Sequence, residues 1–197
     1  MPFDRDVYFD AVRSTLFGGS LEQVQVDGQN IILAVWEYQG GGHGPGVPGD
    51  VRHLAYMLAT VHHECAARFW PIVEYGSQSY LEGKKYYPYI GRGWVMLTWE
   101  DNYRRASEEL NLTDERDLVE NPEMALDSLI ATRILFTGMA DGWFTGKKLS
   151  DYFNSSKDDP VNARQIINGN DKDTLIAGYH EDFLAALNAA QKEKANV

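Results

Sequence analysis

The stretch DVRHLAYMLATVHHEC, residues 50–65, decides the fold because it has the pattern of a long helix packed in a core. Asp50 is a typical N-cap residue, and we expect the helix to run from there to about Phe69. Its apolar residues recur every three or four positions and so share one helical stripe: Leu54, Leu58, Val61 and Cys65. Glu64 lies about 60° from Val61 on the helical wheel. This margin places a carboxylate half in the core and half in a cleft.

The segments on either side of this helix complete a mainly helical pattern. Residues 1–39 predict helices docked on the main body, and the glycine- and proline-rich residues 40–49 predict a loop. Residues 71–89 lose the helical period and predict irregular chain or a short antiparallel hairpin. Further helices are expected over residues 99–110, 121–139, 159–167 and 173–192. The 197 residues are enough for one domain, 1–197, with a small irregular or β element beside a cleft.

Composition narrows the functional classes. The formal net charge is −11, and an acidic chain repels phosphate backbones, so we expect no nucleic-acid partner. No apolar run approaches the roughly 20 residues that span a bilayer, so we expect no membrane insertion. The N-terminus has no apolar region typical of a secretory signal. We therefore expect synthesis in the cytoplasm, as a monomer without a cofactor, and release by other means if the protein acts outside.

Carboxylates are the candidate catalytic groups. Cleavage of a glycosidic bond needs one carboxylic acid and a second carboxylate. Glu64 is the candidate acid, because partial burial beside apolar residues favours the protonated form of a carboxyl group. Glu74 and Glu82 are both candidates for the second carboxylate. The competing interpretation of each is ordinary surface charge.

Other residues near this helix add to the pattern. Nine aromatic residues lie from Phe69 to Trp99, and aromatic rings of this kind could pack on sugar rings. Some of them must instead pack in the core, and Phe69 and Trp94 are the best candidates for that. Arg133 interrupts an apolar stripe and either reaches the cleft carboxylates or extends outward. His62 and His63 are adjacent and point in different directions, so we expect no metal site. Cys65 lies on the apolar stripe, where a thiol is usually inert.

Several segments, taken in order, resemble family 19 glycoside hydrolases. Residues 59–66 (ATVHHECA) resemble the family's ATxxHETA segment, and residues 89–103 (YIGRGWVMLTWEDNY) resemble its YxGRGxxQLTWxxNY segment. Residues 71–76 (PIVEYG) follow the first segment at the family's distance. Residues 121–123 (NPE) and 166–169 (IING) match two later motifs. Residues 16–21 and 25–28 resemble the leader of the bacterial and phage branch, so the resemblance covers nearly the whole chain.

The resemblance implies a lysozyme-like helical fold and an endo-acting glycosidase. By position, Glu64 corresponds to the family's general acid and Glu74 to the second glutamate of the endolysin branch, while Glu82 lies nearer to that of plant chitinases. Thr98 matches the residue that positions the attacking water. Inversion, usual in the family, requires carboxylates about 6.5–9.5 Å apart. The expected substrate-binding residues are Glu82, Tyr89, Arg92, Met96, Asn102, Arg133 and Asn168.

Three apolar residues depart from the family pattern. Cys65 replaces a hydroxyl residue next to the acid, Met96 replaces a glutamine, and Trp70 stands where the endolysin branch often has glutamine. These changes are compatible with an altered substrate, a slower enzyme or a protein that binds without cutting. The sequence therefore leaves three functions open: a phage or prophage endolysin that cuts peptidoglycan, a chitinase, and a non-catalytic glycan-binding or virion protein.

Overall fold

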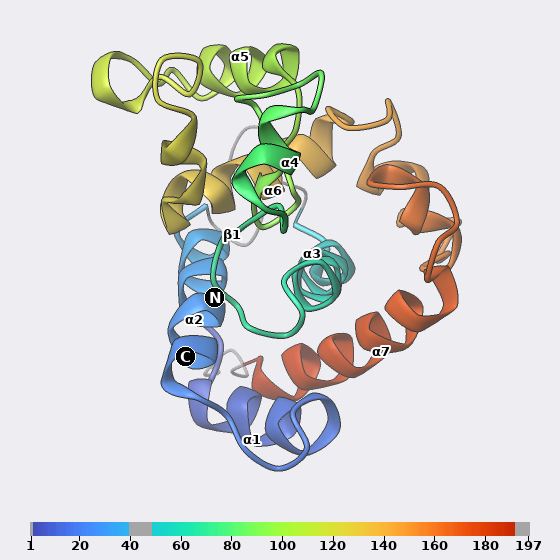
Figure 1. The fold of residues 1–197 in the computed structure, drawn as a ribbon. Helices are drawn as coiled ribbons and strands as arrows, with labels where there is room; N and C mark the ends of the chain where they lie inside the picture. The colour runs from blue at the N-terminus through green and yellow to red at the C-terminus, as the bar shows by residue number, and fades with distance from the viewer. Residues whose placement is uncertain (1, 40–48, 192–197) are drawn as a thin grey trace.

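The helix α3 (Val51–Glu64) lies at the centre of the molecule, enclosed by other helices (Figure 1). This computed structural model describes residues 2–39 and 49–191. Asp50 caps the helix by accepting a hydrogen bond from the amide of Arg52, as the sequence predicts. Every residue from His53 to His62 is buried, so α3 has apolar neighbours on all sides rather than along one stripe.

The element order confirms a mainly helical fold with a small β element. The other α-helices are α1 (Arg5–Leu16), α2 (Gln23–Tyr38), α4 (Gln78–Glu82), α5 (Glu100–Glu109), α6 (Ser128–Asp141) and α7 (Asp173–Ala190). Short 3-10 helices are η1 (Asp114–Arg116), η2 (Pro122–Leu126), η3 (Leu149–Asp151) and η4 (Asn162–Ile166). The strands β1 (Ile72–Val73) and β2 (Arg92–Gly93) pair antiparallel, with Ile72 opposite Gly93.

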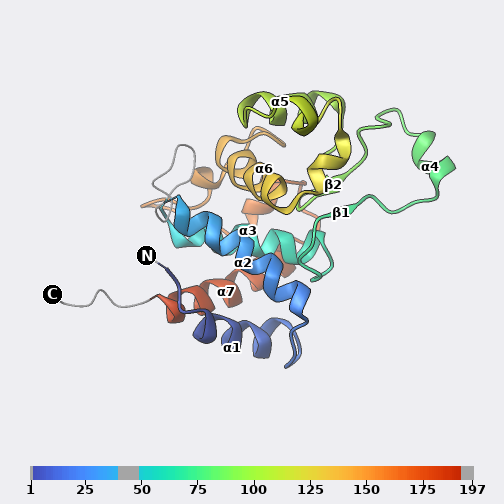
Figure 2. The same cartoon turned by 90° about the vertical axis from the view of Figure 1, so that its left-hand side faces the viewer.

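One core joins the helices around α3. α7 packs along α3, α1 packs against α7, and α2 contacts both α3 and α6 (Figures 1 and 2). Phe69 and Trp94, the expected core aromatics, are both buried in this cluster. The predicted loop at residues 40–49 lies almost wholly outside the described residues. No helix in the described part of the chain is both long enough and apolar enough to cross a bilayer.

The central helix ends earlier than the sequence predicts. Cys65 is its C-cap, and the expected continuation to Phe69 is wrong because Ala66, Ala67 and Phe69 have φ of 49°, 59° and 54°. These left-handed values are incompatible with a continuing helix. The chain therefore turns sharply directly after Glu64, which leaves that side chain at the exposed end of a buried helix.

Helix α2 contacts the backbone of this turn at two points. The side-chain amide of Gln25 donates to the carbonyl of Ala67 at 2.9 Å. A Cβ atom on Gly28 would lie only 1.8 Å from the Phe69 carbonyl oxygen, so only glycine permits this approach. The N-terminal helices thus fix the backbone that carries the end of α3.

The region from residue 71 to 89 combines irregular chain with a short helix. β1 pairs with β2 beyond the end of that region, so the hairpin alternative placed the pairing too close in sequence. Between the strands, α4 lies on an arm that projects from the body (Figure 2). Ser77 caps α4 by accepting from the amide of Tyr80 at 3.3 Å.

The expected single helix from Asn121 to Met139 is also wrong. η2 ends at Leu126, and α6 begins after a new cap, because the Asp127 carboxylate accepts from the amides of Leu129 and Ile130. An aspartate before a serine is a strong N-cap signal that the sequence carries. The expected helices near residues 99–110 and 173–192 are confirmed as α5 and α7, and the one at 159–167 is the short η4.

Candidate active site

Glu64 forms an ion pair at the C-terminal end of α3. Its carboxylate accepts a hydrogen bond from the Arg164 guanidinium at 2.6 Å. The Glu64 side chain is 17% exposed, whereas that of Arg164, from η4, is 3% exposed. Arg164 also donates through Nε to the Asp171 carbonyl at 2.9 Å. A buried, fixed guanidinium therefore orients a carboxylate that still reaches solvent.

Sequence reasoning missed Arg164. The only available signal was a cation between the apolar Ala163 and Ile166, directly before the IING motif. A charge in such a position usually has a buried acidic partner. The partner is Glu64, 100 residues earlier, and that distance could not be read from local spacing.

The neighbour of Glu64, Cys65, points into the core. Its thiol lies 3.9 Å from the Gly93 carbonyl and 3.7 Å from the Trp94 carbonyl, distances typical of weak S–H donation. Burial, and secondarily the charge of Glu64, raises the pKa of the Cys65 thiol to about 12. A thiol that stays protonated is a poor nucleophile, as expected. The residue links the end of α3 to the backbone after β2.

Glu74 is held directly after strand β1. The hydroxyl of Tyr86 donates to its Oε1 at 2.8 Å, and the amide of Gly91 donates to its Oε2 at 3.1 Å. The Glu74 amide in turn donates to the Gly91 carbonyl at 2.7 Å. Both carboxylate oxygens thus have a donor that comes from the protein itself.

Gly91 brings Thr98 and Met96 next to this carboxylate. A Cβ atom built on Gly91 would lie 2.9 Å from the methyl carbon of Met96 and 3.4 Å from the Thr98 hydroxyl. The Thr98 hydroxyl donates to the Met96 carbonyl at 2.7 Å, and the Asn102 amide donates to the Thr98 carbonyl at 2.7 Å. Met96 and Thr98 therefore pack against the glycine beside Glu74, and Asn102 holds the backbone of Thr98.

A small pocket connects this group with the segment that binds Glu64. The pocket has a volume of about 140 Å³, and its walls include Met96, Thr98, Asn102 and Ile167. Ile167 follows Arg164 by three residues, and the amide of the exposed Asn168 donates to the Arg164 carbonyl at 3.0 Å. The segment of η4 thus contacts Glu64 at one point and lines the pocket beside Thr98 at another.

Two predicted residues lie away from these carboxylates. Glu82 is exposed at the end of α4 on the projecting arm, where its carboxylate accepts from Gln78 at 2.8 Å (Figure 2). Arg133 donates to the Leu110 carbonyl at 2.8 Å and faces the surface between α2, η2 and α6. The alternative in which Arg133 reaches the cleft carboxylates is therefore wrong. Of the two candidate carboxylates, Glu74 lies at Gly91, which contacts Thr98, whereas Glu82 lies on the projecting arm.

Arg92 and Tyr89 hold the loop around the site. Arg92 is buried and donates to the Pro88 carbonyl at 2.9 Å, the Tyr103 hydroxyl at 3.1 Å and the Glu123 carboxylate at 2.7 Å. A guanidinium so engaged supports the fold and is not presented to a ligand. Tyr89 is half-buried, and its hydroxyl donates to the Val119 carbonyl at 3.4 Å.

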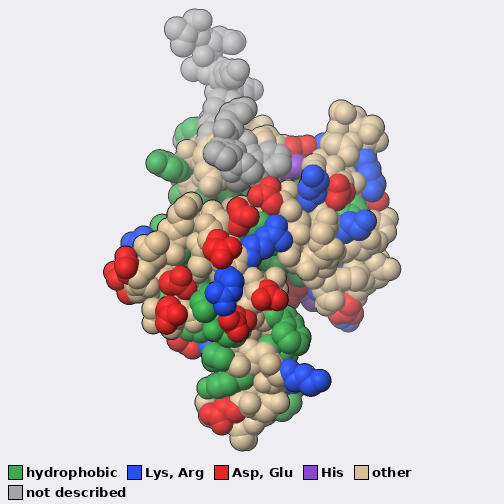
Figure 3. Space-filling model, turned by 90° about the horizontal axis from the view of Figure 1, so that it is seen from above, with side chains coloured by type: hydrophobic (Ala, Val, Ile, Leu, Met, Phe, Trp, Pro, Cys, Tyr) green, Lys and Arg blue, Asp and Glu red, His purple; other side chains and the backbone are tan. Residues whose placement is uncertain are grey.

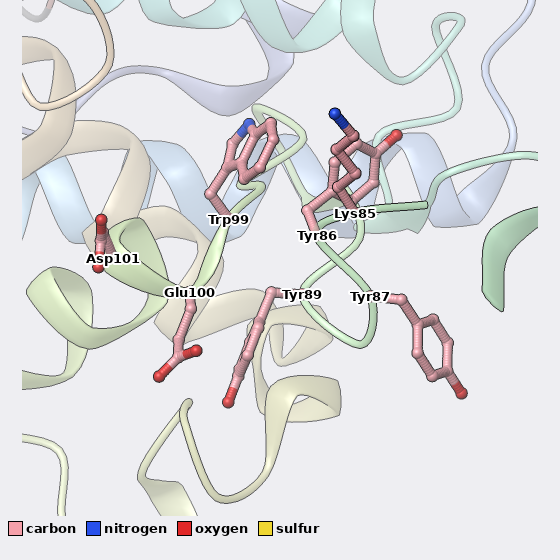
Figure 4. A pocket seen from close by; sticks show the side chains of 7 residues that line it. All are labelled: Lys85, Tyr86, Tyr87, Tyr89, Trp99, Glu100 and Asp101. Carbon is pink, nitrogen blue, oxygen red and sulfur yellow. The ribbon is translucent and has the colours of Figure 1, made fainter. Parts of the chain in front are cut away.

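Aromatic side chains gather beside Glu74. A second pocket of about 290 Å³ is lined by Lys85, Tyr86, Tyr87, Tyr89, Trp99, Glu100 and Asp101 (Figure 4). Trp99 also forms a wall of the smaller pocket, so the two pockets are neighbours. Seen from above, hydrophobic side chains are prominent on the projecting arm, whereas acidic and basic ones mix over the body (Figure 3). No group of three or more metal-ligating side chains occurs within residues 2–39 and 49–191.

Comparisons with known proteins support the fold. No protein-family model matches the chain, and no curated protein sequence matches it. A solved structure, described as a bacterial family 19 chitinase whose enzymatic properties differ from those of plant enzymes, matches with a TM-score of 0.54 and 19% identity over 95% of both chains. The likeness to that enzyme shows that this chain has the same lysozyme-like helical fold.

Proposed function

We propose that this protein is a glycoside hydrolase that cuts β-1,4-linked amino-sugar polymers, with Glu64 as general acid and Glu74 as the second carboxylate. The observation that carries this proposal is the placement of the two carboxylates. Glu64 stands at the open end of the buried helix α3, and Glu74 stands beside Gly91 and Thr98. The segment of η4 contacts the first and lines the pocket next to the second.

In the proposed reaction, Glu64 gives its proton to the glycosidic oxygen as the bond from that oxygen to the anomeric carbon breaks. A water molecule beside Glu74 and Thr98 attacks the anomeric carbon, and Glu74 takes the proton that the water loses. The Arg164 guanidinium, 2.6 Å from the Glu64 carboxylate, orients that group.

The walls of the two pockets suit a sugar polymer. Sugar rings have apolar faces that pack on aromatic rings, and Trp99 is half exposed between the pockets. Asn102 lines the smaller pocket, and the exposed Asn168 follows Ile167, which lines it too; amide side chains of this kind can hydrogen-bond sugar hydroxyls. Met96 offers only a thioether there, which narrows the polar contacts available to the substrate.

Within this class we propose peptidoglycan as the substrate and a phage or prophage endolysin as the role. The bacterial-type leader and the spacing of Glu64 and Glu74 support this assignment. We further propose that the protein acts as a monomer on the cell wall after release from the cytoplasm. Chitin is the second candidate, because the matching solved structure is described as a chitinase.

The proposal is tested with purified protein and its Glu64→Gln variant on peptidoglycan sacculi and on chitin oligomers. We expect turnover of peptidoglycan by the native protein and its loss in the variant, because glutamine cannot donate the proton. Glu181→Gln, at an exposed position on α7, is the matched control. Turnover of chitin alone would replace the proposed substrate. Glycan binding without cleavage by any of the proteins would refute the enzymatic function and identify a binding protein.

A further inference from the structure

Tyr86 connects the Glu74 carboxylate with the aromatic pocket. Its hydroxyl donates to Oε1 of Glu74 at 2.8 Å. Its ring meets that of Trp99 in an edge-on arrangement, with the centroids 5.0 Å apart. The residue is half-buried and comes from the loop that precedes Gly91, whose amide binds the other oxygen of the same carboxylate. Glu74 is therefore clamped between a backbone donor and a side-chain donor.

We propose that Tyr86 is a positioning residue, whose hydroxyl fixes the Glu74 carboxylate in the orientation in which it accepts a proton from water. This inference rests on the proposed function of Glu74. A carboxylate held only by the Gly91 amide could rotate about its terminal bond, because one donor leaves the second oxygen free. A second donor on the other oxygen removes that freedom and leaves lone pairs on both oxygens for water.

The chemistry of the donor matters. A lysine or arginine in the same place would orient the carboxylate but would also neutralise its charge. Lys84, two residues before Tyr86, instead donates to the Tyr80 hydroxyl at 2.5 Å and lies over the Tyr80 ring. The bond to Glu74 raises the pKa of the Tyr86 phenol, so its hydroxyl keeps its proton through the neutral range. A neutral donor thus fixes the carboxylate and preserves its ability to accept a proton.

Kinetics of Tyr86→Phe test the proposal. This variant keeps the ring that packs on Trp99 and removes only the hydroxyl. We expect kcat to fall about 10-fold with KM unchanged, because the carboxylate loses the donor that fixes its orientation while the pocket walls stay as they are. Tyr38→Phe removes a tyrosine hydroxyl at an exposed position on α2, away from both pockets, and should leave kcat unchanged. An unchanged kcat in Tyr86→Phe, with turnover by the native protein, would overturn the inference but not the proposed function.

A double-mutant cycle separates positioning from direct contact with substrate. If Tyr86 acts through Glu74, the Tyr86→Phe change should have no further effect on the residual activity of Glu74→Gln. Additive losses would show that Tyr86 contacts the substrate itself and would refute the positioning role.

A titration without substrate keeps the inference testable if no glycan is cleaved. In the full chain, the carbon-13 NMR signal of the Tyr86 phenol should titrate at lower pH in Glu74→Gln than in the native protein, because the charge-assisted bond is lost. Absence of turnover would refute the proposed function alone. An unchanged Tyr86 titration would show that the contact with Glu74 is not held in solution and would overturn the inference.

Discussion

Lowering the pH from about 7.5 to about 4.5 should remove about 5 kcal/mol of folding stability, because two histidines are buried in their neutral form. The first is His62, in the last turn of α3. Burial, and secondarily the charge of His63, lowers the pKa of His62 to about 4. Its ring packs among aromatic side chains: Phe17, Phe69, Tyr179 and Phe183.

The second histidine is His180, on the face of α7 that packs against α3. Its ring stacks on Phe153 with the centroids 5.1 Å apart and lies tilted against Tyr56. Burial lowers the pKa of His180 to about 4, against smaller effects of opposite sign from Asp158 and Asp50 and a further lowering by Arg52. Protonation of either histidine would place a charge in the buried contact between α3 and α7.

The magnitude follows from the difference between folded and unfolded states. An unfolded histidine has a pKa of about 6.5, so the unfolded chain binds protons that the folded chain does not. Stability is therefore complete above about pH 6.5 and is lost as the pH falls towards about 4. At about pH 4.5 the loss is about 2.5 kcal/mol for each histidine. His53, whose pKa burial also lowers, adds to the loss in the same window.

Urea unfolding followed by circular dichroism at several pH values between about 7.5 and 4.5 measures this loss. His62→Gln and His180→Gln should each be less stable at neutral pH but should show about half the native dependence on pH. His63→Gln changes the partly exposed neighbour and is the matched control. A native stability that stays constant across the window, or variants with the native pH dependence, would refute the reasoning.

The Asp50 carboxylate does not interfere with this measurement, because its contribution to stability changes at lower pH. Burial tends to raise the pKa of Asp50, but hydrogen bonds from Arg52 outweigh it and the pKa is lowered. Its stabilising effect is present above the unfolded value of about 3.9 and is lost only below it.

Three further predictions concern the turn after α3 and the ion pair. Arg164→Leu should cost about 3 kcal/mol in urea unfolding because it leaves Glu64 without its partner, and an unchanged midpoint would contradict the pairing. The Cys65 thiol should resist disulfide reagents in the folded protein and react after denaturation; rapid labelling of the native protein would show that it is not buried. Gly28→Ala should cost about 1–3 kcal/mol because its methyl group would collide with the Phe69 backbone, and native stability in thermal unfolding would refute that close contact.

The sequence allowed the helical framework to be predicted because that framework depends on local patterns. The Asp50 cap and the apolar period placed α3. The motifs from Tyr89 to Tyr103 grouped Met96, Thr98 and Asn102, and in the structure these three residues line one pocket. The predicted end of α3 was wrong because Ala66 and Ala67 adopt left-handed backbone conformations, which an alanine in the sequence gives no reason to expect. Tertiary contacts with α2 decide that turn.

Long-range pairs were beyond pattern analysis. Nothing near Glu64 indicates that its partner is Arg164, and nothing near Glu74 indicates that Tyr86 rather than Tyr87 or Tyr89 supplies its donor. The direction of Arg133 was open for the same reason, since helical periodicity gives a face but not the neighbour that covers it. Contacts of this kind become visible only when the fold brings distant segments together.

The support that Gln25 and Gly28 give to the turn after α3 limits how far this chain could be shortened. The residues that resemble catalytic motifs all follow residue 58, so a fragment without the first two helices would still carry them. Such a truncation would remove the two contacts beneath Ala67 and Phe69 and release the backbone at the base of Glu64. For protein engineering, α2 should therefore be kept together with the candidate site, and fusion partners should be joined at the chain ends rather than in place of this helix.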